Sequence, residues 1–201
     1  MTTGDVRHSS GTRAALEITT IASTEASLVA VNSLLHDGQT TLAELRDRYE
    51  RTVRSWPHTL RTRLVLSLAT PLLESPGESR LSYWMWRHGV PGPTAQYEVR
   101  DSAGHMYARL DFAWPERGVW VEFDGRAKYE TLARPGESAA DVVLREKARE
   151  DMVRELTGWI CVRVTWADLA DPARLMQRLE QAFKSAERMR SRMHLTSHGA
   201  R

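Results

Sequence analysis

The chain has 201 residues and a formal net charge of +2, a length that allows one sizeable core with a small helical appendage. Hydrophobic residues make up 41% of the chain and charged residues 27%, which is ordinary for a soluble globular protein, and so small a net charge does not by itself indicate nucleic-acid binding. The single cysteine, Cys161, excludes an internal disulfide and lies in an apolar run, so a buried structural thiol is expected. Because no signal-peptide or membrane-spanning pattern is present, the sequence predicts a cytoplasmic protein with no membrane partner.

The N-terminal part of the chain is predicted to be entirely helical after a disordered start. Residues 1–12 are polar and aperiodic. Residues 13–70 carry apolar residues at helical spacing, and Thr41 with Glu44 forms the capping-box pattern that begins a helix. This region has no cluster of chemically reactive side chains. We expect a helical scaffold, whose surface is also where a protein partner would bind.

From Ser75 onward the pattern changes to an alternation of helices and strands. Ser75 opens a helix that ends at Gly89, and three short strands follow, joined by the turns "DSAG" and "PERG". A charged helix, the strand "WICVRVTW" and a closing helix complete the order. The order α-β-β-β-α-β predicts an α/β domain with a mixed sheet over residues 75–190, followed by a flexible tail at 191–201.

The second of these turns defines a hairpin with two chemically different faces. With "PERG" as the loop, Trp114 pairs with Val119, and continuing outward Asp111 faces Glu122 and Arg109 faces Asp124. One face is then apolar, made of Leu110, Phe112, Trp114, Val119, Val121 and Phe123. The other face carries the charged residues and Trp120, which would either stack a base or be covered by the first helix of the domain.

The facing acidic residues of this hairpin need a cation. Like charges directly opposite each other on neighbouring strands destabilise a sheet, so Asp111 opposite Glu122 is a cost unless something positive lies between them. A hard divalent ion such as Mg²⁺ is one solution, because it prefers carboxylate oxygens. Neutralisation of a solvated face by Arg109 and nearby basic residues is the other, and the pattern alone leaves both open.

Over residues 75–170 the sequence resembles the PD-(D/E)XK nuclease superfamily, and within it the very-short-patch-repair-like branch. The resemblance rests on three stretches: "DFAWPERGVWVEFDGRAKYE", "LREKAREDMVRELTGW" and "CVRVTWADL". Many relatives in that branch carry an N-terminal winged-helix domain of the AbiEi antitoxin type. No such domain is evident here, and residues 13–70 look like the linker region that follows it.

The resemblance implies a restriction-endonuclease-like fold that binds Mg²⁺ or Mn²⁺ and hydrolyses phosphodiester bonds, in DNA rather than RNA. By position, it implies that Asp111 and Glu122 are metal-binding carboxylates and that Asp124 is an additional ligand. Glu78 would match an auxiliary acidic residue of the family. Ser75 and Glu78 also form a capping box, which explains this glutamate without any chemistry, and both roles stay open.

The chain departs from the superfamily pattern at the residue expected to be lysine. That position, two residues after the metal-binding acid, is Asp124. Branch members often place a histidine or lysine about four residues further on, where this chain has Lys128, and Lys147 on the charged helix is a second candidate for the missing cation. The alternative is a catalytically weak or inactive nuclease-fold protein that binds DNA or regulates as antitoxin-like proteins do. The sequence indicates no oligomeric state.

Overall fold

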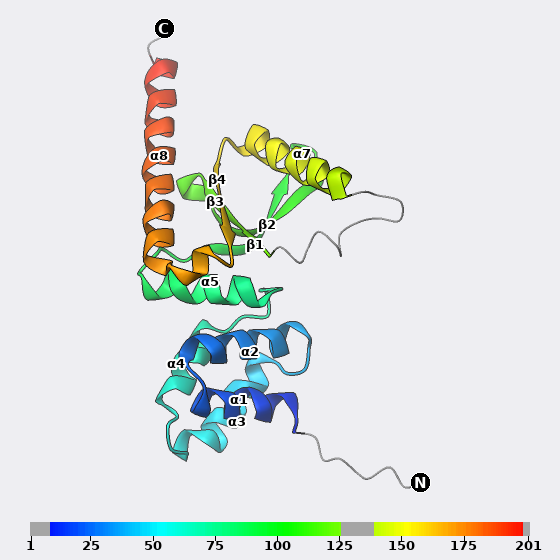
Figure 1. Ribbon diagram of the computed structural model, residues 1–201, viewed down its shortest axis with the longest axis vertical. Helices are drawn as coiled ribbons and strands as arrows, with labels where there is room; N and C mark the ends of the chain where they lie inside the picture. Colours follow the sequence, from blue (N-terminus) through cyan, green and yellow to red (C-terminus); the bar gives the residue numbers. More distant parts are fainter. Residues whose placement is uncertain (1–8, 126–138, 199–201) are drawn as a thin grey trace. The chain divides into compact units, whose positions relative to one another are not determined.

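The computed structural model describes residues 9–125 and 139–198, which divide into two compact units, the first ending at Tyr83 and the second beginning at Trp84 (Figure 1). The sequence pattern placed the domain boundary just before Ser75, whereas the two units divide within helix α5 (Pro76–Arg87). Each unit is described separately below.

The first unit is helical, as its sequence pattern predicts. Its α-helices are α1 (Gly11–Ile21), α2 (Thr24–His36), α3 (Leu42–Arg51) and α4 (Leu60–Leu68), with the 3-10 turn η1 (Val53–Ser55) between the last two. The predicted capping box is present: Thr41 Oγ1 accepts a hydrogen bond from the Glu44 amide, and Glu44 Oε2 accepts one from the Thr41 amide. Helix α1 begins at Gly11 with Ser10 as its cap, so the helix reaches two residues into the segment predicted to be disordered.

The second unit contains a four-stranded mixed sheet, which confirms the α/β fold class. Its strands are β1 (Thr94–Arg100), β2 (Met106–Trp114), β3 (Val119–Asp124) and β4 (Ile160–Thr165), in the spatial order β1-β2-β3-β4. The first three are antiparallel, and β4 runs parallel to β3 after the crossover helix α7 (Ala139–Thr157). With α5 ahead of β1, the elements follow the predicted α-β-β-β-α-β order.

The hairpin of β2 and β3 has the predicted register next to its turn. Its pairs are Trp114–Val119, Ala113–Trp120 and Phe112–Val121. The turn is the 3-10 segment η2 (Pro115–Arg117), closed by Gly118 at a φ of +65°, a left-handed conformation that glycine adopts without strain. The alternation of apolar and polar residues therefore fixed the register correctly at these three pairs.

Helices α7 and α8 (Pro172–His198) lie on opposite faces of the sheet (Figure 1). Trp114 packs edge-on against Phe183 of α8 with 5.1 Å between ring centroids, whereas Trp120 belongs to a buried cluster with Val153 of α7. Trp120 is therefore covered by α7, and its burial excludes the predicted alternative of base stacking. The prediction that the first helix of the domain covers it was wrong, because the crossover helix lies on this face.

The prediction for Leu110 was also wrong. The alternation placed it on the face of Trp114, but it packs in the cluster that contains Trp120 and Val153. The break in alternation lies in β2 itself, because Leu110 packs in the same cluster as Ala113, three residues away. The paired residues of β2 and β3 end at Phe112–Val121, so a register extended from the turn does not hold at Leu110.

Helix α8 continues beyond the predicted end of the domain. Residues 191–201 were predicted to be a flexible tail, yet the helix extends through His198. The sequence between Pro172 and His198 contains no glycine and no further proline, so nothing in it interrupts the helical hydrogen bonds. None of the helices in the described ranges has the length and apolar character that crossing a bilayer requires.

Asp168 joins the end of β4 to α8, and its replacement gives a pH-dependent prediction. Its Oδ2 accepts hydrogen bonds from the amide and hydroxyl of Thr165, both at 2.8 Å, and its Oδ1 accepts one from Arg178 at 2.8 Å. Burial opposes ionisation, but these hydrogen bonds and the charge of Arg178 outweigh it and lower the pKa of Asp168 below its ordinary value.

We expect Asp168→Asn to lower the free energy of unfolding at pH 7 by about 1–3 kcal/mol, the usual effect of losing hydrogen bonds to a charged group. A carboxyl group whose pKa is depressed by folding stabilises the protein above its unfolded pKa of about 4, and this contribution is lost as the pH falls through the folded pKa. The difference between wild type and variant in urea unfolding should therefore shrink below about pH 4. A difference that stays constant down to pH 2 would contradict this role.

Candidate functional site

Asp111 is a nearly buried carboxylate, 8% exposed, at the point where the paired residues of β2 and β3 end. Its Oδ2 accepts a hydrogen bond from the backbone amide of Phe123 at 2.7 Å. The side chain thus holds β3 at the residue directly after Glu122. Because an aspartate with a backbone partner has little rotational freedom, this contact fixes the carboxylate beside β3.

The backbone of β1 directly across from Asp111 is strained. Gln96 lies opposite it between two regular pairs and has a left-handed φ of +51°, which costs a residue with a side chain roughly 1–3 kcal/mol. Strain of this kind persists where the surrounding structure enforces it, and it concentrates at functional sites. It is a second sign, independent of charge, that this part of the sheet is specialised.

Glu122 lies against an arginine from α7. Its side chain is 13% exposed, and its Oε2 is 3.4 Å from Nη2 of Arg149. The same Nη2 is 3.3 Å from Glu146, and Nη1 donates to the backbone carbonyl of Arg109 at 3.4 Å. Burial opposes the charge of Arg149, but the carboxylates of Glu122, Glu146 and Asp111 outweigh it and raise the pKa of this arginine above its ordinary value. The carboxylates of Asp111 and Glu122 therefore both act on one guanidinium group.

Asp124, the last residue of β3, takes part in a different ion-pair network. Its Oδ2 is 3.9 Å from Nη1 of Arg163 on β4. Arg163 also pairs with Glu150 of α7, which in turn accepts Arg154 at 2.6 Å. The cation beside Asp124 therefore comes from β4, and the pairing of Arg109 with Asp124 that the sequence suggested is not among the paired residues of the hairpin.

Of the three acidic residues of the hairpin, Asp111 and Glu122 are the two to consider as metal ligands. Within the described ranges, no group of three or more histidine, cysteine or acidic side chains is placed to hold a metal, so Asp111, Glu122 and Asp124 do not converge as a set of three. Mg²⁺ usually keeps several waters and is held by one or two carboxylates together with substrate phosphates. Asp111 and Glu122 supply that number of carboxylates on one face of the sheet.

Glu78 caps helix α5. It is buried, its Oε1 accepts the Ser75 hydroxyl at 2.6 Å, and its Oε2 accepts the amide of Glu74 at 3.0 Å. The Ser75 hydroxyl oxygen accepts the Glu78 amide at 3.1 Å, which completes the cap. The capping role predicted from the sequence is thus confirmed, while the auxiliary role in catalysis stays a prediction.

The structure bears differently on the two lysines considered for the missing cation. Lys128 lies outside the described residues, and Lys147 is exposed on α7. Arg149, which the sequence reasoning missed, is the described cation beside the carboxylates. Helical spacing could have found it: Glu146, Arg149 and Val153 recur at intervals of three and four residues, and Val153 is the buried residue of the face that meets the sheet.

Cys161 on β4 was predicted to be a buried structural thiol, and it is half-buried. It packs at the edge of the cluster that contains Trp120 and Val153. Burial first, and then the nearby charges of Glu150 and Glu122, raise the pKa of the thiol to about 12. The thiolate is therefore scarce at neutral pH, which argues against Cys161 as a nucleophile.

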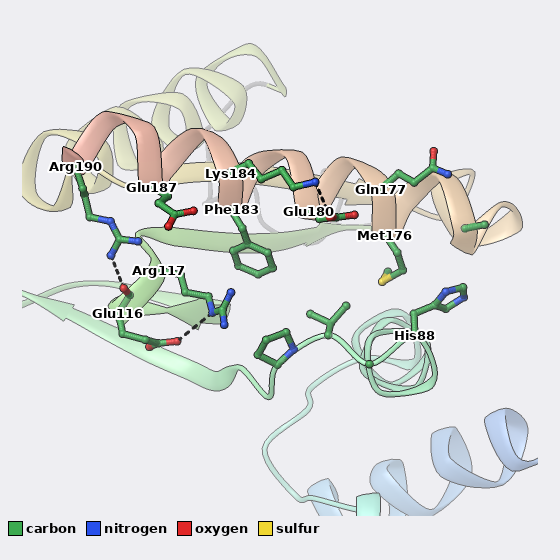
Figure 2. A pocket seen from close by; sticks show the side chains of 14 residues that line it. His88, Glu116, Arg117, Met176, Gln177, Glu180, Phe183, Lys184, Glu187 and Arg190 are labelled. Atoms are coloured by element: carbon green, nitrogen blue, oxygen red, sulfur yellow. Dashed lines mark hydrogen bonds and ion pairs between the residues drawn. The ribbon is translucent and has the colours of Figure 1, made fainter. Parts of the chain in front are cut away.

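A cavity of about 840 Å³ lies on the other side of the sheet, along α8 (Figure 2). Phe183 and Met176 of α8 form its apolar part, opposite Pro91. Its charged rim is paired within the chain, since Lys184 binds Glu180 at 2.7 Å and Arg190 donates to the carbonyl of Glu116. None of the predicted site residues that the structure describes lines this cavity.

Comparison of the chain with protein-family profiles, curated proteins and solved structures found no match. Any assignment of function therefore depends on the residues of the site and their geometry.

Proposed function

We propose that this chain is a divalent-metal-dependent endonuclease that hydrolyses phosphodiester bonds in DNA. The observation that carries the proposal is the pair of carboxylates, Asp111 and Glu122, on adjacent strands of one sheet face and beside a single guanidinium. The repulsion between two carboxylates on one hairpin opposes folding, and a bound cation would offset this repulsion.

The arrangement of the second unit supports this proposal. The three-stranded meander, the crossover helix α7 and the parallel strand β4 are the parts expected of a restriction-endonuclease-like core. In that core the two acids are expected on the second and third strands, which is where Asp111 and Glu122 lie.

Asp111 and Glu122 would hold Mg²⁺ or Mn²⁺, with water molecules and substrate phosphate oxygens as the remaining ligands. The ion, when bound, lowers the pKa of a water molecule and stabilises negative charge on the phosphoryl group. The Phe123 amide holds the Asp111 carboxylate in place through a hydrogen bond. Trp120 and Val153 belong to the buried apolar cluster between the sheet and α7. In the hydrolysis, the attacking water gives up one proton to solvent as its oxygen forms a bond to phosphorus. The bond from phosphorus to the leaving sugar oxygen breaks, and that oxygen takes up a proton from solvent.

A second candidate is a nuclease-fold protein that binds DNA or regulates without cleaving, as antitoxin-like relatives of the branch would. Two observations favour it: Asp124 stands where the superfamily has lysine, and Glu122 is already engaged by Arg149. Under this alternative, the arginine replaces the metal and the carboxylates serve only the fold.

Calorimetric titration with Mn²⁺ distinguishes the two candidates. Wild type is expected to bind Mn²⁺, and Asp111→Asn to lower the affinity by at least about tenfold, since it removes one charged ligand. Asp151→Asn is the matched control, because Asp151 is an exposed acid of α7, and it should bind as wild type does. Wild type without Mn²⁺ binding, or an Asp111→Asn variant with unchanged affinity, would refute the metal site.

A further inference from the structure

The proposed site lacks the cation that its superfamily pattern would supply at position 124. Two carboxylates beside a phosphodiester repel its negative charge, so a cation at the same place is needed to bind the substrate and to stabilise the transition state. We propose that Arg149, on the crossover helix α7, is this catalytic cation and binds the phosphate that is cleaved at Asp111 and Glu122. This inference rests on the proposed nuclease function.

The contacts of Arg149 hold it in place without using its full capacity as a donor. Its contacts to Glu122, Glu146 and the Arg109 carbonyl are all 3.3–3.4 Å, longer than the roughly 2.7–2.9 Å of a strong charge-assisted hydrogen bond. Its Nε is buried and has no hydrogen-bond partner among the described residues. A guanidinium group has five N–H donors, so Arg149 can approach a phosphate with donors that its present partners hold only weakly.

Arg149 is charged and only partly open to solvent. Its side chain is 33% exposed, and a guanidinium group is not deprotonated in proteins. An ion that is partly removed from water interacts more strongly with a phosphate than a solvated surface arginine does. The planar guanidinium also matches the geometry of two phosphate oxygens, which an ammonium group cannot do.

The position on α7 separates Arg149 from the other cation considered on this helix. Arg149 lies four residues before Val153, whose side chain is buried in the cluster under the sheet face that carries the site. Lys147 lies six residues before Val153, which places it on the far side of the helix, and its side chain is exposed. Lys147 therefore provides a matched control of like charge on the same helix.

The test compares Arg149→Met, Arg149→Lys and Lys147→Met with wild type in two assays. Steady-state cleavage of a labelled DNA at saturating Mn²⁺ gives kcat and KM, and calorimetry without nucleic acid gives the Mn²⁺ affinity. Arg149→Met is expected to lower kcat by about 100-fold, the lower end of the effect of removing one donor to a developing negative charge. Its Mn²⁺ affinity should equal or exceed that of wild type, because a competing positive charge has been removed from Glu122. Arg149→Lys should restore part of kcat, and Lys147→Met should match wild type.

Each other outcome overturns the inference. If Arg149→Met cleaves within threefold of wild type, Arg149 does not act on the substrate. If the variant loses Mn²⁺ binding together with cleavage, Arg149 only holds Glu122 in position. If wild type neither binds Mn²⁺ nor cleaves, the proposed nuclease function itself fails. This failure is seen in the wild-type protein, whereas the first two outcomes are seen only in Arg149→Met.

Discussion

Asp111→Asn is expected to abolish metal-dependent cleavage, with a fall in rate of at least about 10³-fold, while the protein stays folded. Asparagine has nearly the shape of aspartate and keeps an oxygen that can accept the Phe123 amide, now bonded at 2.7 Å to Asp111 Oδ2. It lacks the negative charge that a hard divalent ion requires of its ligand. The substitution therefore separates the chemical role of Asp111 from its role in the hairpin.

Asp111→Ala is the contrasting variant. It removes the charge and also leaves the Phe123 amide without its side-chain acceptor in a buried place, which costs about 1–3 kcal/mol of stability. We expect Asp111→Asn to retain the wild-type melting temperature more closely than Asp111→Ala, and both to be inactive. An Asp111→Asn variant that cleaves within tenfold of wild type would show that Asp111 does not bind the metal.

Trp114→Ala is expected to have the largest effect on stability, a loss of about 3–5 kcal/mol in the free energy of unfolding. Trp114 is fully buried at the end of β2, packs edge-on against Phe183 of α8 and donates its indole N–H to the carbonyl of Pro91 at 2.7 Å. Its removal leaves a large cavity between the sheet and α8 and an unpaired carbonyl. Guanidinium unfolding, followed by circular dichroism, measures the loss.

Two further variants sharpen the Trp114 prediction. Trp114→Phe keeps an aromatic ring against Phe183 but loses the bond to Pro91, so an intermediate loss is expected. Trp86→Ala is the comparison variant, because Trp86 is 43% exposed and its removal gives up less buried apolar area, so a smaller loss than for Trp114→Ala is expected. If Trp114→Ala cost no more than Trp86→Ala, Trp114 would not anchor α8 to the sheet.

The local pattern of the sequence predicted the elements and the hairpin well for a physical reason. Strand side chains alternate faces strictly, so one apolar run fixed which residues oppose each other near the turn, as the pair Ala113–Trp120 shows. Capping is equally local, and the Thr41 and Ser75 caps were predicted by their spacing to a glutamate. Leu110 was misplaced because the paired residues of β2 and β3 end at Phe112–Val121, and the alternation extended from the turn does not hold beyond that pair.

Only the part of the candidate site that comes from the β2–β3 hairpin was predictable from the sequence. Asp111 and Glu122 come from one hairpin, and the turn predicted them opposite each other, although the paired residues end at Phe112–Val121, one position before them. Their cation comes from α7, 27 positions beyond Glu122, and which side of that helix faces the sheet depends on how Val153 is buried. The partner of Asp124 comes from β4, which meets β3 only through the parallel crossover. Contacts of this kind depend on the docking of distant elements, which local patterns do not determine.

Cleavage of nucleic acid by the purified wild-type chain is the decisive test of the proposed nuclease activity. Labelled double-stranded DNA, single-stranded DNA and RNA are incubated with Mg²⁺, with Mn²⁺ and with a chelator, and the products are separated by length. We expect the protein to cleave DNA, to stop cleaving in chelator and to cleave again when the metal is restored. Intact nucleic acid under every condition, from a protein that is folded and free of bound chelator, would contradict the nuclease assignment and favour a binding role for the same fold.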